Sequence, residues 1–151
     1  MAPEPPPGHL VVDPSIIIPF VLQREHSDLA ASVIRAMTRH HADAPAIFFP
    51  EVQHVLLKGE RGGEIELEDC ERFIDRLRPL VMIHGHDLPI RDVRDLSRKH
   101  ALSYYDALYL HLALERGRTI ATRDERLGEA AVAEGVGLFP PADPADTETA
   151  P

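Results

Sequence analysis

The chain has 151 residues, 44% of them hydrophobic and 27% charged, a composition that fits one globular domain and excludes the disordered and fibrous classes. Its formal net charge of −9 gives no broad basic footprint for nucleic acid, although four of the acids lie in the terminal segments, at Glu4, Asp143, Asp146 and Glu148. The single cysteine excludes an internal disulfide, and no apolar run is long enough to span a membrane. Because the N-terminus also lacks the features of a leader, we expect a soluble, cytoplasmic protein.

Both terminal segments are rich in proline and alanine: MAPEPPPG at residues 1–8 and PADPADTETAP at residues 141–151. Such segments bury too little apolar surface to offset the entropy lost on ordering, so they are predicted to be flexible tails. The folded domain is predicted to span residues 9–140.

Between the tails, short β-branched or aliphatic runs alternate with longer segments of helical period. The predicted strands are residues 9–12, 46–49, 80–83, 119–122 and 136–139. The predicted helices are residues 27–41, 51–63, 67–78, 89–100, 104–117 and 124–135. Several of these helices stop at glycine, a common helix terminator. The alternation predicts parallel strands joined by crossover helices, which is an α/β sandwich.

Two acids lie where the first predicted strands give way to helical segments. Asp13 ends the first strand and precedes Pro14, which is an ordinary helix N-cap arrangement. Glu51 opens the helix that follows Pro50, where the helix dipole favours a negative charge without any function. Taken singly, these two acids do not predict an activity.

Two further acids have equally simple local explanations. Asp106 follows Ser103 by three residues, which is close to the spacing of a capping box, with Ser103 capping the helix. Asp124 lies between Thr122 and Glu125, which have the same spacing. Helix capping alone therefore accounts for acids at these positions.

Local structure does not explain why all four acids, Asp13, Glu51, Asp106 and Asp124, fall at strand ends or helix starts. In a parallel sheet these positions share the carboxyl edge, where open α/β folds bind ligands. Anions gathered there repel one another unless cations intervene. Oxygen ligands without thiolates suit Mg²⁺ or Mn²⁺, so the pattern predicts a site for such ions.

Three segments, in this order and spacing, resemble the PIN domain, and within that family the VapC-type ribonuclease toxins of bacterial toxin–antitoxin pairs. The segments are VVDPS at 11–15, APAIFFPEVQHVLLKGERGGEI at 44–65 and ALSYYDALYLHLALERGRTIATRDERLGEAA at 101–131. The last is the most specific, because it is similar along its full length to a helix, a short strand and a turn of the family.

The resemblance implies a PIN-like three-layer α/β/α sandwich with a central parallel sheet. It also implies metal-dependent endonucleolytic cleavage of single-stranded RNA with one or two Mg²⁺ or Mn²⁺ ions, which leaves a 5′-phosphate. The implied metal ligands and catalytic residues are Asp13, Glu51, Asp106 and Asp124, and Ser15 and Thr122 would orient carboxylates or contact phosphate. The implied partners are RNA, a cognate antitoxin and a second copy of the chain.

The sequence departs from the family pattern at Pro14, at Pro19 in the expected first helix, and at His54, where an asparagine is common. His54 is either a contributor to metal or substrate binding or a polar residue at the rim of the pocket. If these changes have inactivated the metal site, the chain is instead a protein-binding module with the same fold. This alternative stays open at the level of the sequence.

Two further features have both a functional and a structural interpretation. Four arginines near the third segment either steer an RNA backbone toward the acids or complement nearby acids and helix ends: Arg116, Arg118, Arg123 and Arg126. Apolar stripes along residues 27–37 and 67–77 either serve an antitoxin or dimer contact or belong to the core.

Overall fold

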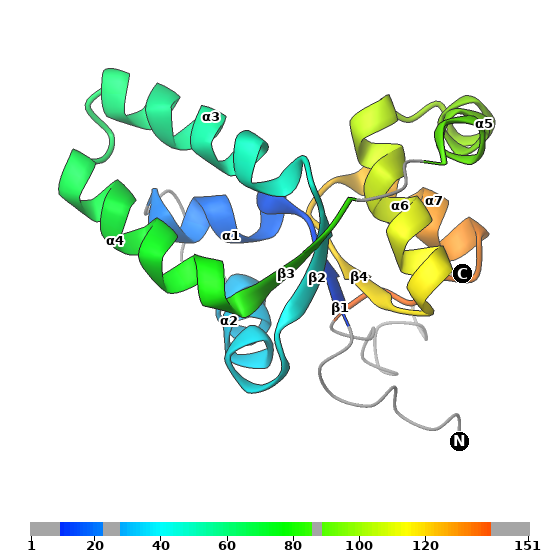
Figure 1. Ribbon diagram of the computed structural model, residues 1–151, viewed down its shortest axis with the longest axis horizontal. Coiled ribbons are helices and arrows are strands. Elements are labelled where there is room, and N and C mark those ends of the chain that lie inside the picture. Colours follow the sequence, from blue (N-terminus) through cyan, green and yellow to red (C-terminus); the bar gives the residue numbers. More distant parts are fainter. Residues whose placement is uncertain (1–9, 23–27, 86–88, 140–151) are drawn as a thin grey trace, which may run out of the picture.

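The computed structural model describes residues 10–22, 28–85 and 89–139. Within these ranges four parallel strands form one sheet in the order β3-β2-β1-β4 (Figure 1). The strands are β1 (Leu10–Val12), β2 (Ala42–Pro45), β3 (Val81–His84) and β4 (Thr119–Ala121). The predicted flexible tails, residues 1–8 and 141–151, lie outside the described residues.

Helices cover both faces of the sheet (Figure 1). The elements are α1 (Pro14–Val21), α2 (Asp28–His40), α3 (Phe48–Arg61), α4 (Leu67–Leu77), the 3₁₀ turn η1 (Arg78–Leu80), α5 (Ile90–His100), α6 (Tyr104–Arg116) and α7 (Glu125–Ala133). The first four helices lie on one side and the last three on the other, so the predicted three-layer α/β/α sandwich is confirmed.

The core is centred on β1 and α6. All three residues of β1 are buried, as expected for a strand with a parallel neighbour on either side. Helix α6 contacts β1, β2 and β4 and buries Tyr109 and Leu110 completely. In the described part of the chain no helix is long and apolar enough to cross a membrane.

The predicted strand at residues 46–49 is wrong. Strand β2 lies immediately before it, in the small and polar sequence Ala42–Pro45, and α3 begins at Phe48. Phe48 is fully buried at the start of that helix. A short apolar run does not distinguish a buried strand from a buried helix end, and Pro50 is tolerated in a first helical turn.

The predicted strand at residues 136–139 is reduced to a single parallel bridge between Leu138 and Ile120. Two backbone bonds support the bridge, one from Ile120 N to the Gly137 carbonyl and one from Phe139 N to the Ile120 carbonyl. Glycine within a strand weakens it because it has no side chain to pack, so Gly137 explains why pairing stops after one bridge.

Helix α1 forms in spite of Pro19, which lies inside it. Pro14 occupies the first helical turn, where a missing N–H group costs nothing. Three consecutive isoleucines, Ile16, Ile17 and Ile18, are buried and hold the helix against the rest of the domain. Asp13 is thereby fixed at the junction between β1 and α1.

Candidate active site at the carboxyl edge of the sheet

Asp13 is buried, with 6% of its surface exposed, at the point where β1 ends and α1 begins. It occupies the N-cap position of α1, but its side chain makes no capping hydrogen bond. Instead its Oδ2 accepts hydrogen bonds from Ser15 Oγ at 2.5 Å and from Thr122 Oγ1 at 2.7 Å. Helix capping therefore does not account for the Asp13 side chain.

Ser15 and Thr122 join the β1–α1 junction to the turn that follows β4. Their hydroxyl oxygens lie 3.3 Å apart. The backbone N–H of Arg123 donates to Ser15 Oγ, and that of Asp124 donates to Thr122 Oγ1, each at 3.0 Å. This network places Asp13 and Asp124 at the same edge of the sheet.

Asp124 is the N-cap of α7, because its Oδ1 accepts a hydrogen bond from Leu127 N at 2.9 Å. The capping spacing of Thr122 and Glu125 therefore did not identify the cap, since Thr122 uses its hydroxyl on Asp13 and on the turn. Capping holds one oxygen of Asp124 in place.

Asp106 lies in the first turn of α6, and Ser103 caps that helix as the spacing predicted. Ser103 Oγ accepts a hydrogen bond from Asp106 N at 3.0 Å and donates one to Asp106 Oδ2 at 2.6 Å. The hydroxyl of Ser103, rather than its backbone, therefore holds the Asp106 carboxylate.

Glu51 lies in the first turn of α3, just beyond the end of β2, and is partly buried. Its Oε1 accepts a hydrogen bond from the hydroxyl of Tyr109 on α6 at 2.7 Å. Tyr109 was not among the predicted site residues. The available signal was a polar aromatic residue three positions after Asp106, which places it on the same face of the helix.

The carboxylates act on one another electrostatically. Burial raises the pKa of Asp13, and the negative charges of Asp106 and Asp124 raise it further, while the hydrogen bonds from Ser15 and Thr122 lower it. Burial also raises the pKa of Glu51, with smaller contributions from Asp13 and Asp106. Folding thus gathers the acids around Asp13 without neutralising them by close ion pairs within the described residues.

Each of the four carboxylates has one oxygen held by a protein donor. Those oxygens are Asp13 Oδ2, Glu51 Oε1, Asp106 Oδ2 and Asp124 Oδ1. Among the described residues no side-chain oxygen or nitrogen that is fully buried lacks a hydrogen-bond partner. Within the described residues, the second oxygen of each of these carboxylates accepts no hydrogen bond from the protein.

The donor set fits a hard divalent cation, because it consists of carboxylate oxygens with hydroxyl groups behind them. As the side chains stand, no three His, Cys, Asp or Glu residues of the described ranges lie close enough together to hold one ion. Mg²⁺ does not need such a cage, since it usually keeps several waters and takes one or two carboxylates together with substrate phosphates.

Two of the four arginines considered above are engaged away from the acids of this edge. Arg118 Nε donates to Asp43 Oδ2 at 3.1 Å, and an Arg116 N–H group lies 3.0 Å from His84 Nδ1. These two arginines complement their neighbours. His54 is exposed, one turn after Glu51 on α3.

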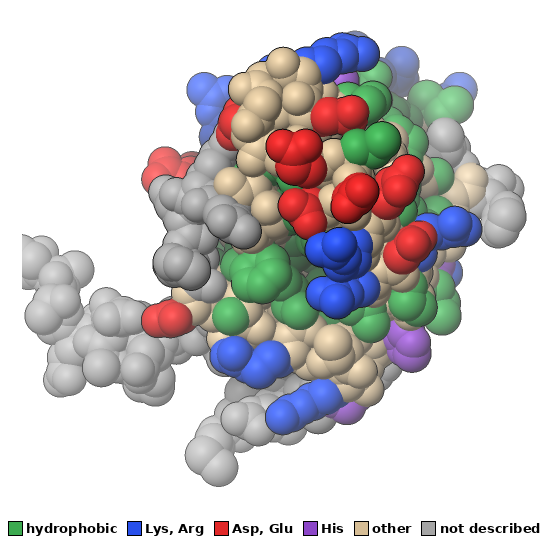
Figure 2. Space-filling view, turned by 90° about the vertical axis from the view of Figure 1, so that its left-hand side faces the viewer, with side chains coloured by type: hydrophobic (Ala, Val, Ile, Leu, Met, Phe, Trp, Pro, Cys, Tyr) green, Lys and Arg blue, Asp and Glu red, His purple; other side chains and the backbone are tan. Residues whose placement is uncertain are grey.

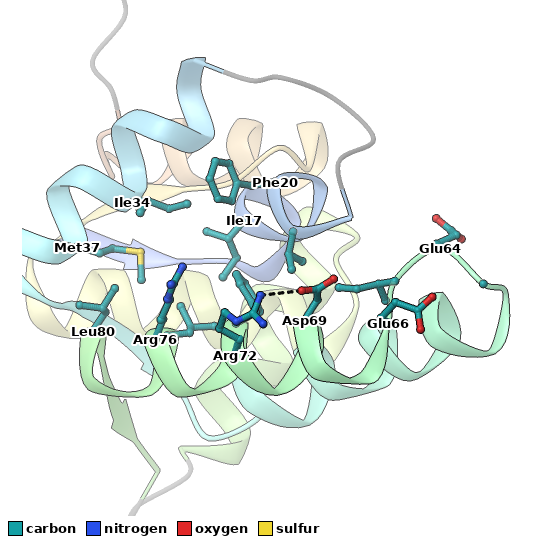
Figure 3. Close-up of a pocket in the computed structure, with 15 residues that line it drawn as sticks. Ile17, Phe20, Ile34, Met37, Glu64, Glu66, Asp69, Arg72, Arg76 and Leu80 are labelled. Carbon is teal, nitrogen blue, oxygen red and sulfur yellow. Dashed lines mark hydrogen bonds and ion pairs between the residues drawn. The ribbon is translucent and has the colours of Figure 1, made fainter.

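A large apolar groove lies between α1, α2 and α4, with a volume of about 620 Å³. Figure 3 shows Ile17 and Phe20 of α1 facing Met37 of α2 across it. Arg72 and Asp69, joined by an ion pair of 2.9 Å, lie on its α4 side. On this face of the molecule, acidic side chains gather in the upper part of the view, with basic side chains below them and along the upper rim (Figure 2). The groove is distinct from the carboxylate edge.

Comparisons with known proteins agree with this fold. The PIN domain model matches residues 10–133. Ribonuclease VapC3 of Mycobacterium tuberculosis is 32% identical over 129 residues, which cover 85% of this chain and 92% of the relative. Ribonuclease VapC3 of Pyrobaculum aerophilum is 30% identical over 124 residues, which cover 80% and 92% of the two chains.

Two crystal structures share the fold at lower sequence identity. PAE2754 from Pyrobaculum aerophilum aligns with a TM-score of 0.63 and 22% identity, over 82% of this chain and 78% of the other. FitAcB from Neisseria gonorrhoeae aligns with a TM-score of 0.56 and 18% identity, over 86% and 96%. These two structures show the shared fold. The family match and the curated relatives show that the chain belongs to the PIN domain family and is of the VapC type.

Proposed function

We propose that the chain is a metal-dependent endoribonuclease that cleaves single-stranded RNA. The observation that carries the proposal is the carboxyl edge of the sheet, where four carboxylates each have one oxygen held by a protein donor and, within the described residues, one oxygen without such a donor. The relatives named Ribonuclease VapC3 support the same reaction class.

In this proposal Asp13, Glu51, Asp106 and Asp124 hold one or two Mg²⁺ or Mn²⁺ ions. A bound ion would activate water and neutralise charge that develops on the phosphodiester. Ser15 and Thr122 fix the orientation of Asp13 through its Oδ2, leaving Oδ1 for the ligand. Hydrolysis by water is expected to leave a 5′-phosphate and a 3′-hydroxyl on the two products.

The proposal further makes the chain the toxin of a type II toxin–antitoxin pair, and it expects a homodimer. The groove between α1, α2 and α4 supports a protein partner, because the partly buried Ile34 of α2 and Phe73 of α4 line it beside the exposed Phe20. Phe20, half-exposed in this groove, is a suitable probe. Phe20→Glu is expected to release an antitoxin encoded in the adjacent reading frame while RNA cleavage is retained.

The reaction is tested with the purified chain, a labelled single-stranded RNA, and Mg²⁺ or Mn²⁺ in turn. Asp106→Asn removes one charge from the edge but keeps an acceptor for the Ser103 hydroxyl, so the fold is expected to survive while cleavage is lost. Asp95→Asn is a matched control, because it makes the same chemical change at an exposed position of α5.

Cleavage that requires the ion, disappears in Asp106→Asn and persists in Asp95→Asn supports the proposal. Absence of cleavage with either ion, in a chain that is folded by circular dichroism, contradicts it. That second result would favour the alternative of a protein-binding module whose metal site has decayed.

A further inference from the structure

Tyr109 carries the least expected polar contact of the candidate site. Its side chain is fully buried on α6, among the aliphatic residues of the core. A buried tyrosine hydroxyl needs a partner, and this one donates to Glu51 Oε1 at 2.7 Å. The bond joins α6 to α3, and the two bonded residues are 58 positions apart in the chain.

The environment keeps Tyr109 a donor. Burial, and then the hydrogen bond and charge of Glu51, raise the pKa of Tyr109 above its usual range, so the hydroxyl keeps its proton at any pH used for an assay. In return, the hydrogen bond lowers the pKa of Glu51, in opposition to burial, which raises it.

The same contact restricts the orientation of Glu51. A glutamate side chain has three torsions, and fixing them when a ligand binds costs conformational entropy. With Oε1 held from behind by a rigid aromatic side chain, the Glu51 carboxylate has fewer orientations open to it before a ligand binds. No other hydrogen bond to the Glu51 carboxylate is present within the described parts of the chain.

We propose that Tyr109 is a positioning residue that orients Glu51 for divalent-cation binding. The inference rests on the proposed metal site, and it assigns to that site a residue that touches neither the ion nor the RNA. Loss of a hydrogen-bonding partner behind a metal ligand typically weakens metal affinity by about 10- to 100-fold. Tyr109→Phe removes only the hydroxyl oxygen and keeps the ring in the core.

The experiment measures Mn²⁺ binding to the full chain without RNA, from the electron paramagnetic resonance signal of the free ion. Tyr109→Phe is expected to weaken Mn²⁺ binding by about tenfold. Tyr105→Phe is the matched control, because Tyr105 lies on the same helix with 57% of its surface exposed. The Tyr105→Phe variant is expected to bind Mn²⁺ with the same affinity as the unmodified chain. Thermal unfolding verifies that both variants are folded.

A double variant separates orientation of Glu51 from a general loosening of the core. If Tyr109 acts through Glu51, adding Tyr109→Phe to Glu51→Gln causes no further loss of Mn²⁺ affinity, whereas a loosened core would weaken binding again. The first result supports the proposal and the second overturns it. This comparison also applies if Tyr109→Phe lowers stability.

Equal Mn²⁺ affinity in Tyr109→Phe and the unmodified chain overturns the positioning role while the proposed metal site stands. Absence of any Mn²⁺ binding to the unmodified chain overturns both. The two failures are therefore distinguishable in one set of titrations.

Discussion

Two aspartates on neighbouring strands have opposite surroundings. Asp43 on β2, with a side chain 15% exposed, accepts a hydrogen bond from Arg118 Nε and lies 2.7 Å from His84 Nε2. Asp13, at the end of β1, is more deeply buried and is held by the hydroxyls of Ser15 and Thr122. Within the described residues no Lys, Arg or His side chain forms an ion pair with Asp13.

The contrast lies in the charges that the fold places around each aspartate. At Asp43 the chain supplies a guanidinium group from just before β4 and an imidazole from the end of β3, so the partly buried charge is paired. At Asp13 it supplies further acids instead, and the pKa of Asp13 rises through burial and their charges. Acids left unneutralised at a sheet edge are typical of functional sites.

The largest expected effect separates the two aspartates by activity. Asp13→Asn is expected to lower the rate of RNA cleavage by at least about 100-fold, since losing even a residue behind a metal ligand costs about 10- to 100-fold. The loss is measured on single-stranded RNA at saturating Mn²⁺. An Asp13→Asn variant that retains wild-type activity would remove Asp13 from the site.

The converse substitution tests stability. Asp43→Asn leaves the partly buried side chains of Arg118 and His84 with a weaker hydrogen-bond acceptor. We therefore expect it to lower the free energy of unfolding by about 1–3 kcal/mol. Its cleavage activity at saturating Mn²⁺ is expected to stay close to that of the unmodified chain. Urea denaturation gives the stability. A large loss of activity in a folded Asp43→Asn protein would show that the two aspartates are not functionally distinct.

The smallest effect is the dependence of stability on pH. Because burial raises the pKa of Asp13 above its usual 3.8, the folded state binds this proton more tightly than the unfolded state. The corresponding stability is fully present below the unfolded pKa and is lost as the pH rises through the raised value. Asp13→Asn has no such proton to lose.

The metal-free Asp13→Asn variant is therefore expected to gain stability relative to the unmodified chain as the pH rises from about 3.8, the unfolded pKa, toward neutrality. Denaturation at a series of pH values gives the difference in unfolding free energy between the two proteins. If the stability gained by Asp13→Asn shrinks as the pH rises, the pKa of Asp13 is not raised by folding, and this prediction is wrong.

The layered fold was predictable because alternating strand and helix patterns restrict the topology strongly. Strand β2 was not, since its sequence Ala42–Pro45 is small, contains an aspartate and ends in proline. Its Asp43 is paired with His84 and with Arg118, and Arg118 lies 75 residues later in the chain. Sequence alone does not show that pairing, so the apolar run after it was taken for the strand.

The candidate site divides in the same way. That Asp13, Glu51, Asp106 and Asp124 lie at one edge follows from the topology, because strand ends and helix starts meet there. The contacts that hold them do not follow, since Ser15 and Thr122 are 107 residues apart and Tyr109 looks like a core residue. Local rules also misplaced the cap of α7, because the hydroxyl of Thr122 is used by a residue far away in the sequence.

The central claim is that folding gathers these carboxylates around a bound cation. The most direct measurement is an anomalous difference map from a crystal of the full chain soaked in Mn²⁺. We predict a peak at the carboxyl edge, within about 2.5 Å of an oxygen of Asp13 and of at least one other of the four acids. A fully soaked crystal with no peak there, or with its strongest peak elsewhere on the molecule, would contradict the account.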